Sequence, residues 1–124
     1  MLFRSAQIKY ALGISGVHSV EHAWWCAENK EKGMKGSQED LLIVRKDQVI
    51  NLCEIKYALS EYTVTGKDIE NIRNKINDVR IATNTRYAIY PTLITTFGMT
   101  DNSYSGEIQS VITADALFEK QASI

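Results

Sequence analysis

The residues Asp40, Glu54 and Lys56 have the types and the spacing of a metal-dependent hydrolytic site. Thirteen residues lie between Asp40 and Glu54, enough for the rest of one strand, a turn and most of the next strand. A hairpin of these two strands would bring the two carboxylates side by side. Magnesium is held by one or two carboxylates while water and substrate phosphate complete its shell, so the pair suits Mg²⁺ or Mn²⁺.

Each residue of this set has a role that follows from its chemistry. Because side chains alternate along a strand, Glu54 and Lys56 would point to one face and Ile55 to the other. The backbone carbonyl of Ile55 is then available as a further metal ligand. A bound ion would polarise a phosphodiester and lower the pKa of a bound water. Lys56 would orient that water or stabilise the negative charge that develops on the phosphate.

A structural explanation of the same residues is also open. An E-x-K sequence on a strand is common and can be a surface stripe of ion pairs, with Asp40 as a charge at the edge of a strand. The site is favoured because Glu54 and Lys56 interrupt an apolar strand, where charged groups are costly unless they are paired or bind a metal.

Basic residues on the expected helix over 65–83 add a weaker hint of nucleic-acid contact. Arg73 and Arg80 fall at one border of its apolar arc, and Lys75 falls at the other. Arg73 and Arg80 are therefore candidate contacts for a DNA phosphate lying across the sheet. The alternative is that their stems cover the edge of the core while their charges stay in water.

The elements that would position these residues follow from the periodicity of the chain. Alternating or continuous apolar runs predict strands, and apolar residues three and four apart predict helices. Thr65 and Asp68 resemble a capping box at the start of the long helix, and Pro91 indicates an edge strand or a bulge. The expected order is αβββαββα, an α+β (α/β) class, with helices over 3–11, 65–83 and 114–120 and strands over 20–27, 38–45, 48–57, 86–97 and 107–113.

Composition limits the classes of protein that this chain can represent. A chain of 124 residues fits one domain, residues 1–124. It shows no run of about 18 apolar residues and no signal pattern, so we expect a cytoplasmic location and no membrane contact. The net charge of −1 gives no global attraction to nucleic acid, so such a role must rest on local features. Cys26 and Cys53 lack metal-ligand spacing and are expected to be buried thiols.

The chain resembles the PD-(D/E)XK nuclease superfamily. The segments GSQEDLLIVRKDQVINLCEIKYA, ENIRNKI and TLITTFGMTDNSYSGEIQSVITADALF are similar to the C-terminal nuclease-like domain of prokaryotic AAA-type ATPases. The resemblance runs from about Gln7 to Phe118 and is clearest over 36–56. It matches Asp40, Glu54 and Lys56 to the D…E-x-K motif of the superfamily.

The resemblance implies a restriction-endonuclease-like core, a central mixed sheet of about five strands flanked by helices. It also implies Mg²⁺-dependent hydrolysis of DNA, with the ATPase part of a longer parent chain as a partner. This chain has no P-loop, so ATP binding is not expected of it. Residues 1–12 contain no acid, although the superfamily often carries one in its first helix. The alternative is an inactive nuclease-fold module that binds DNA or a partner, or that forms a homodimer.

Overall fold

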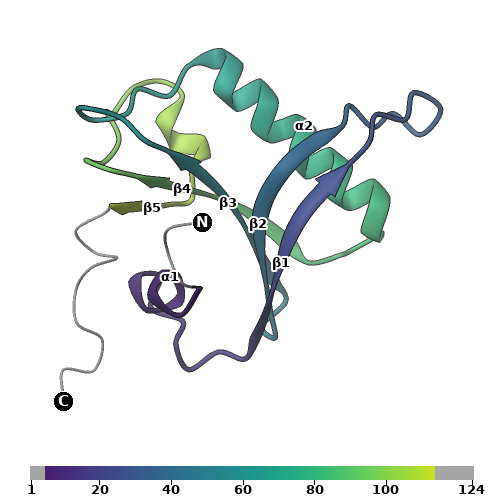
Figure 1. Ribbon diagram of the computed structural model, residues 1–124, viewed down its shortest axis with the longest axis horizontal. Helices are drawn as coiled ribbons and strands as arrows, with labels where there is room; N and C mark the ends of the chain where they lie inside the picture. Colours follow the sequence, from purple (N-terminus) through teal and green to yellow (C-terminus); the bar gives the residue numbers. More distant parts are fainter. Residues whose placement is uncertain (1–4, 114–124) are drawn as a thin grey trace.

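The computed structural model describes residues 5–113, without the side chains of residues 5, 6, 25, 26 and 37–40. The described chain is an α+β structure with one long helix, a short N-terminal helix and a five-stranded mixed sheet (Figure 1). Along the chain the elements are α1 (Ser5–Ala11), β1 (Ser19–Cys26), β2 (Ser37–Arg45), β3 (Val49–Lys56), α2 (Gly66–Thr83), β4 (Ala88–Thr95), the 3₁₀ helix η1 (Ser105–Glu107) and β5 (Ser110–Thr113).

The strands lie side by side in the order in which they occur along the chain. β1, β2 and β3 form an antiparallel meander, whereas β4 runs parallel to β3 and β5 parallel to β4. A parallel connection requires a long crossover, and α2 makes the crossover from β3 to β4. β3 therefore lies in the middle of the sheet, with paired strands on both sides.

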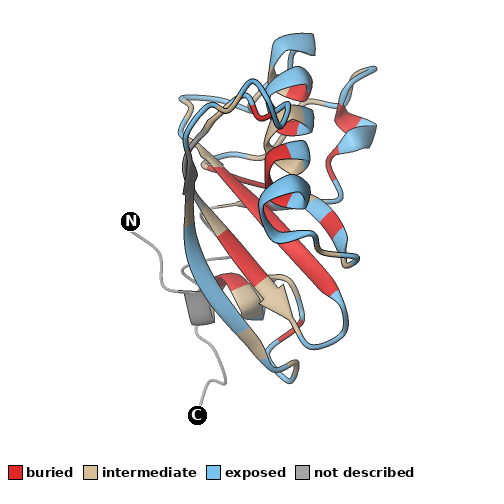
Figure 2. Ribbon diagram, turned by 90° about the vertical axis from the view of Figure 1, so that its right-hand side faces the viewer, coloured by how far each residue is buried: buried red, intermediate tan, exposed pale blue. Residues whose placement is uncertain are grey.

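The two helices cover opposite faces of the sheet, with the strands between them (Figure 1). On one face, Ile8 of α1 packs with Ile43, Cys53 and Ile94 of the central strands. On the other face, α2 packs over two apolar clusters. One contains Val79 with residues of β2, β3 and β4, and the other contains Ile69, Ile72 and Leu93. The buried residues accordingly run along the central strands and the inner side of α2 (Figure 2).

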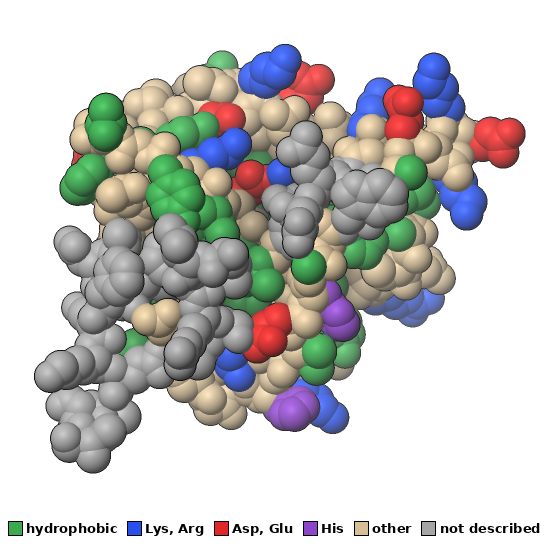
Figure 3. All heavy atoms as spheres, viewed as in Figure 1, with side chains coloured by type: hydrophobic (Ala, Val, Ile, Leu, Met, Phe, Trp, Pro, Cys, Tyr) green, Lys and Arg blue, Asp and Glu red, His purple; other side chains and the backbone are tan. Residues whose placement is uncertain are grey.

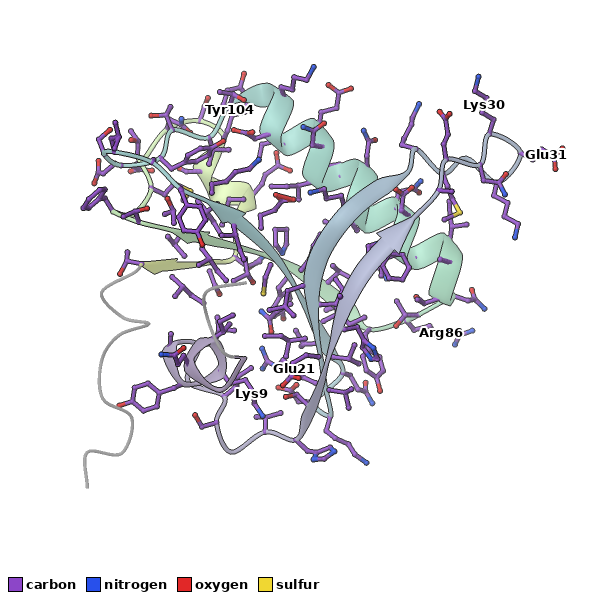
Figure 4. All side chains as sticks on the ribbon, in the orientation of Figure 1. Lys9, Glu21, Lys30, Glu31, Arg86 and Tyr104 are labelled. Atoms are coloured by element: carbon purple, nitrogen blue, oxygen red, sulfur yellow. The ribbon has the colours of Figure 1, made fainter. Side chains whose placement is uncertain are left out.

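The ends of α2 agree with the signals in the sequence. Thr65 is the N-cap, and its side chain accepts a hydrogen bond from the Asp68 N–H while the Asp68 carboxylate accepts one from the Thr65 N–H. This is the expected capping box. Gly66 opens the helix close to Tyr104, since a Cβ there would lie 3.3 Å from the Tyr104 hydroxyl (Figure 4). The helix ends at Asn84, which adopts the left-handed conformation with φ 53°.

Most predicted strands have their expected positions, within one to three residues at each end. The β2–β3 turn is one residue longer than predicted, because Gln48 adopts a left-handed conformation with φ 67° and belongs to the loop. The last strand begins at Ser110 rather than at Glu107, because residues 105–107 form η1. The helix predicted over 114–120 lies outside the described residues.

Pro91 occupies an edge position only locally, because β4 is an interior strand whose ladder with β5 begins one residue later, and Pro91 forms no bulge with β3. β4 lies between β3 and β5, and Pro91 is in regular register with Leu52. The Pro91 carbonyl accepts a hydrogen bond from the Gln109 N–H on the β5 side. A strand residue directs its N–H and its carbonyl to the same side, so the missing N–H faces β5, whose ladder begins only at Thr92. The missing N–H of Pro91 therefore removes no hydrogen bond from the ladder between β4 and β3.

Two further predictions concern the cysteines and membrane-spanning segments. Cys53 is buried, as expected, and the side chain of Cys26 is outside the described part. No helix within residues 5–113 is both long enough and apolar enough to cross a membrane.

Candidate metal centre

Glu54 and Lys56 lie on the α2 face of β3, close to the carboxyl end of this central strand. Leu52, two residues before Glu54, packs in the α2-side cluster, whereas Ile55 packs against the α1-side cluster. This alternation agrees with the expectation that Glu54 and Lys56 share a face. The side chain of Glu54 is only 10% exposed. A carboxylate buried to this degree needs a partner of opposite charge or a metal ion.

Asp40 lies on β2 one residue beyond the part of that strand that pairs with β3. The β2–β3 ladder ends at the pair Leu41 and Cys53. Asp40 and Glu54 are the next residues outward on the two strands, and Asp40 is paired with Trp24 on its other side. The ladder stops one residue short of Asp40 and Glu54, so the approach of these two positions stays a prediction. The side chain of Asp40 is outside the described part, so the sharing of one ion by the two carboxylates stays a prediction.

Lys75, near the middle of α2, is the residue that reaches Glu54. Its ammonium donates a hydrogen bond to Oε1 of Glu54, and its side chain is 18% exposed. The sequence placed Lys75 at a border of the apolar arc, where a basic side chain could reach a DNA phosphate or cover the edge of the core, but did not pair it with Glu54. The available signal was its position three residues after the buried Ile72 and directly before Ile76, which also packs on the sheet.

A second polar network begins beside this pair, where the loop after β3 enters α2. The hydroxyl of Tyr62 donates a hydrogen bond to Oδ2 of Asp68 over 3.0 Å, and the same oxygen accepts the Thr65 N–H, also over 3.0 Å. Lys56 contributes a favourable charge to Asp68, and the charge of Glu54 also acts on Tyr62. The residues Glu54, Lys56, Tyr62, Asp68 and Lys75 therefore form one electrostatic neighbourhood, which we call the β3–α2 cluster.

The ionisation of Tyr62 and Asp68 reflects this neighbourhood. Burial, the hydrogen bond to Asp68 and the negative charges of Asp68 and Glu54 raise the pKa of Tyr62 to about 12. Burial acts to raise the pKa of Asp68 as well. The hydrogen bonds from Thr65 and Tyr62 and the charge of Lys56 outweigh burial, and the pKa of Asp68 is lowered below its usual value. Asp68 is thus an anion near neutral pH.

Thr95 of β4 borders the cluster with an unsatisfied group. It stands opposite Lys56 in the parallel ladder and is only 3% exposed. Its hydroxyl has no hydrogen-bond partner among the described residues. Buried hydroxyls are costly without a partner, so this position can accept a polar group of a ligand or a water.

The two arginines proposed as phosphate contacts both make contacts within the chain. Arg73 binds Glu107 through Nε and Nη2, and its side chain is 67% exposed. This hydrogen bond and the charge of Glu107 raise the pKa of Arg73. Arg80 donates to the carbonyls of Tyr87 and Thr85 over 3.1 and 3.4 Å, beyond the end of α2. Their contact with DNA stays a prediction.

Two surfaces flank the cluster. A groove of about 640 Å³ extends from Trp24 along β1 and the C-terminal half of α2, and its lining is mostly apolar. On the other side, the loops after β3 and β4 expose large side chains (Tyr57, Leu59 and Phe97), and hydrophobic side chains gather on this left-hand part of the surface in Figure 3. The described residues that line the groove include neither Glu54 nor Lys75.

The oxygen donors here suit a hard divalent cation. Glu54 supplies a carboxylate, Asp40 would supply the second, and the Ile55 carbonyl belongs to the same strand. Within the described side chains, no group of three or more His, Cys, Asp or Glu residues could hold a metal ion. Sites for Mg²⁺ do not need such a group, because the ion keeps several waters. The donor chemistry therefore fits Mg²⁺ or Mn²⁺, on the condition that Lys75 gives up its hold on Glu54.

Comparisons with known proteins name no relative. No family model, no curated protein and no solved structure matches this chain.

Proposed function

We propose that this chain is a nuclease-like domain that hydrolyses DNA phosphodiester bonds with Mg²⁺ or Mn²⁺, as an accessory part of an ATP-binding protein. The observation that carries the proposal is the buried carboxylate of Glu54 on the central strand, which binds the ammonium of Lys75 from α2. Buried ion pairs also occur in proteins without a functional site. Such a pair adds little net stability, however, so two charged residues on one face of a central strand suggest a functional role.

The fold supports the same proposal. The order of α1, three antiparallel strands, α2 and a parallel strand is the order of the PD-(D/E)XK core that the sequence resembles. α2 and α1 cover opposite faces of the sheet, as a restriction-endonuclease-like core requires. Fold by itself does not imply activity, so the function depends on the β3–α2 cluster.

In the proposed reaction, Asp40, Glu54 and the Ile55 carbonyl would hold the ion. The ion would supply a Lewis acid and a water of lowered pKa. Lys56 donates a hydrogen bond to the phosphate or to the attacking water. The water oxygen forms a bond to phosphorus, the bond from phosphorus to one ester oxygen breaks, and that oxygen leaves with a proton. The positive charge of Lys56 stabilises the negative charge that the phosphate gains.

Substrate binding would depend on stacking more than on charge. The net charge of −1 cannot attract the DNA backbone strongly. Exposed Tyr57 and Phe97, in the loops next to Lys56 and Thr95, offer faces on which unpaired bases can stack. We therefore expect single-stranded or locally opened DNA to be a better substrate than regular duplex.

The test is an assay of the purified protein with plasmid and single-stranded DNA in Mg²⁺ or Mn²⁺. Asp40→Ala, Glu54→Gln and Lys56→Ala should each abolish cleavage, while the matched controls Glu61→Gln and Lys67→Ala should cleave like the wild type, because both residues are exposed. If the wild type leaves all DNA intact and calorimetry finds no metal binding that depends on Asp40, the proposal is wrong.

An inactive DNA- or partner-binding module is the second candidate, and the contact of Lys75 with Glu54 favours it. A lysine that held Glu54 permanently would exclude the ion. This candidate, which includes use of the domain for dimerisation, predicts binding without cleavage. It is contradicted if cleavage is seen and disappears in Lys56→Ala.

A further inference from the structure

We propose that Lys75 is an exchangeable residue of this site: a divalent cation displaces its ammonium from Glu54, and the released ammonium then binds the phosphate of the substrate. The inference rests on the proposed function and adds to it a residue on α2 outside the D…E-x-K motif.

The first argument is the burial of the ion pair between Lys75 and Glu54. Their side chains are 18% and 10% exposed, so neither charge is well solvated by water. Removal of one partner from such a pair leaves an uncompensated charge and is strongly unfavourable. A divalent cation at Glu54 supplies the missing positive charge. Lys75 can therefore leave the carboxylate only when a cation takes its place, which makes the two events competitive.

The second argument is that the two lysines, Lys56 and Lys75, act on different carboxylates. The charge of Lys56 acts on Asp68 at the N-terminal end of α2, whereas Lys75 binds Glu54 directly. Lys75 is therefore the lysine in contact with the carboxylate that would hold the ion. A phosphate coordinated by this ion would lie within reach of the same ammonium.

The third argument is the flexibility of the lysine side chain. An ammonium on a four-carbon stem can turn from one acceptor to a neighbouring one without movement of the helix. The backbone of Lys75 lies near the middle of α2, which is fixed by Ile72 and Val79 on either side. Exchange of the ammonium from Glu54 to a phosphate thus needs no movement of the helix.

The experiment compares Mn²⁺ binding by calorimetry, without DNA, in the wild type, Lys75→Met and Lys67→Met. Lys67 is an exposed lysine of the same helix, so its variant controls for the loss of one positive charge. We expect Lys75→Met to bind Mn²⁺ about 10-fold more tightly than the wild type, because a competing charge next to the ion is lost. Lys67→Met should bind like the wild type. Lys75→Gln, which can still donate a hydrogen bond to Glu54, serves if Lys75→Met does not fold.

A second measurement is the cleavage of a single-stranded oligonucleotide at saturating Mn²⁺, where Lys75→Met should be at least about 10-fold slower than Lys67→Met, the usual scale for one lost charge contact in a transition state. Tighter Mn²⁺ binding together with slower cleavage supports the exchange. If the wild type binds Mn²⁺ and Lys75→Met binds it equally well, the exchange is wrong and the proposed metal site stands. If Lys75→Met binds more tightly but cleaves at the normal rate, the phosphate contact is wrong. If no variant binds Mn²⁺, the proposed function itself fails and the exchange with it.

Discussion

Two ion pairs begin at neighbouring positions of α2 and differ in their surroundings. Arg73 binds Glu107 at the surface, where the side chains are 67% and 45% exposed. Lys75 binds Glu54 under the helix, where the exposures are 18% and 10%. A step of two residues turns the chain by about 200°, so the two basic side chains leave α2 on different sides.

The difference shows which charge is expected to matter for folding and for function. A pair in water gains little, because solvent screens the charges and the side chains lose freedom. When one partner of a buried pair is removed, the other charge stays buried without compensation, which strongly destabilises the fold. We therefore expect the exchange of a partner to matter at the pair of Lys75 and Glu54, and not at the pair of Arg73 and Glu107.

The largest effect should come from Lys75→Met. This variant leaves the carboxylate of Glu54 buried without a partner, and we expect a loss of about 3 kcal/mol in the free energy of unfolding. Urea denaturation measures it. In the double variant Glu54→Gln/Lys75→Met, most of the loss should return, because the remaining amide carries no charge. A single variant as stable as the wild type would show that the pair is not buried in solution.

A smaller effect should come from the capping box at the start of the same helix. Thr65→Ala removes the acceptor of the Asp68 N–H, and we expect a loss of about 1 kcal/mol in the free energy of unfolding. Thr65→Ser is the matched control and should be close to the wild type. If Thr65→Ala lowers the free energy of unfolding as much as Lys75→Met does, the buried ion pair is no more important for stability than the helix cap, and the account is contradicted.

Tyr62 tests the same cluster through the pH dependence of stability. Its pKa in the folded chain is about 12, against an ordinary value of 10.0. The unfolded chain therefore loses this proton first as the pH rises. The stability that Tyr62 contributes is fully present below pH 10.0 and is lost as the pH rises through about 12. Tyr62→Phe should flatten the stability profile in that window. An unchanged profile would contradict the buried hydrogen bond to Asp68.

The smallest effect should come from Arg73→Ala. Because both partners of this pair lie in water, the urea midpoint should not change within error. The variant also serves as the charge control for Lys75→Met in stability measurements. A clear destabilisation by Arg73→Ala would show that the exposed pair also stabilises the fold, and the two pairs would then not differ as proposed.

Local signals explain which parts of the fold could be predicted. The apolar spacing of Ile69, Ile72 and Val79 and the capping box of Thr65 lie within one element, so the sequence shows them directly. The strands were visible as apolar runs. Gln48 was missed because a left-handed residue other than glycine or asparagine has no simple signal. Pro91 was predicted only in part, because the sequence does not show that β4 gains a neighbour on its second side from Thr92 onward.

The candidate site was predictable in part for the same reason. Glu54 and Lys56 are two apart on one strand, so their common face was visible in the sequence, whereas the approach of Asp40 to Glu54 stays a prediction because the β2–β3 ladder ends at Leu41 and Cys53. The contact between Lys75 and Glu54 depends on where α2 crosses β3. That crossing is a tertiary feature, which the spacing of residues along the chain does not contain. The role of Lys75 therefore required the structure.

The measurement that tests the account most directly is a crystal structure of this chain soaked with Mn²⁺, read from the anomalous scattering of the metal. We predict one anomalous peak between the carboxylates of Asp40 and Glu54, with the ammonium of Lys75 no longer bound to Glu54. A map without a peak at this position, in which Lys75 still holds Glu54, would contradict the account.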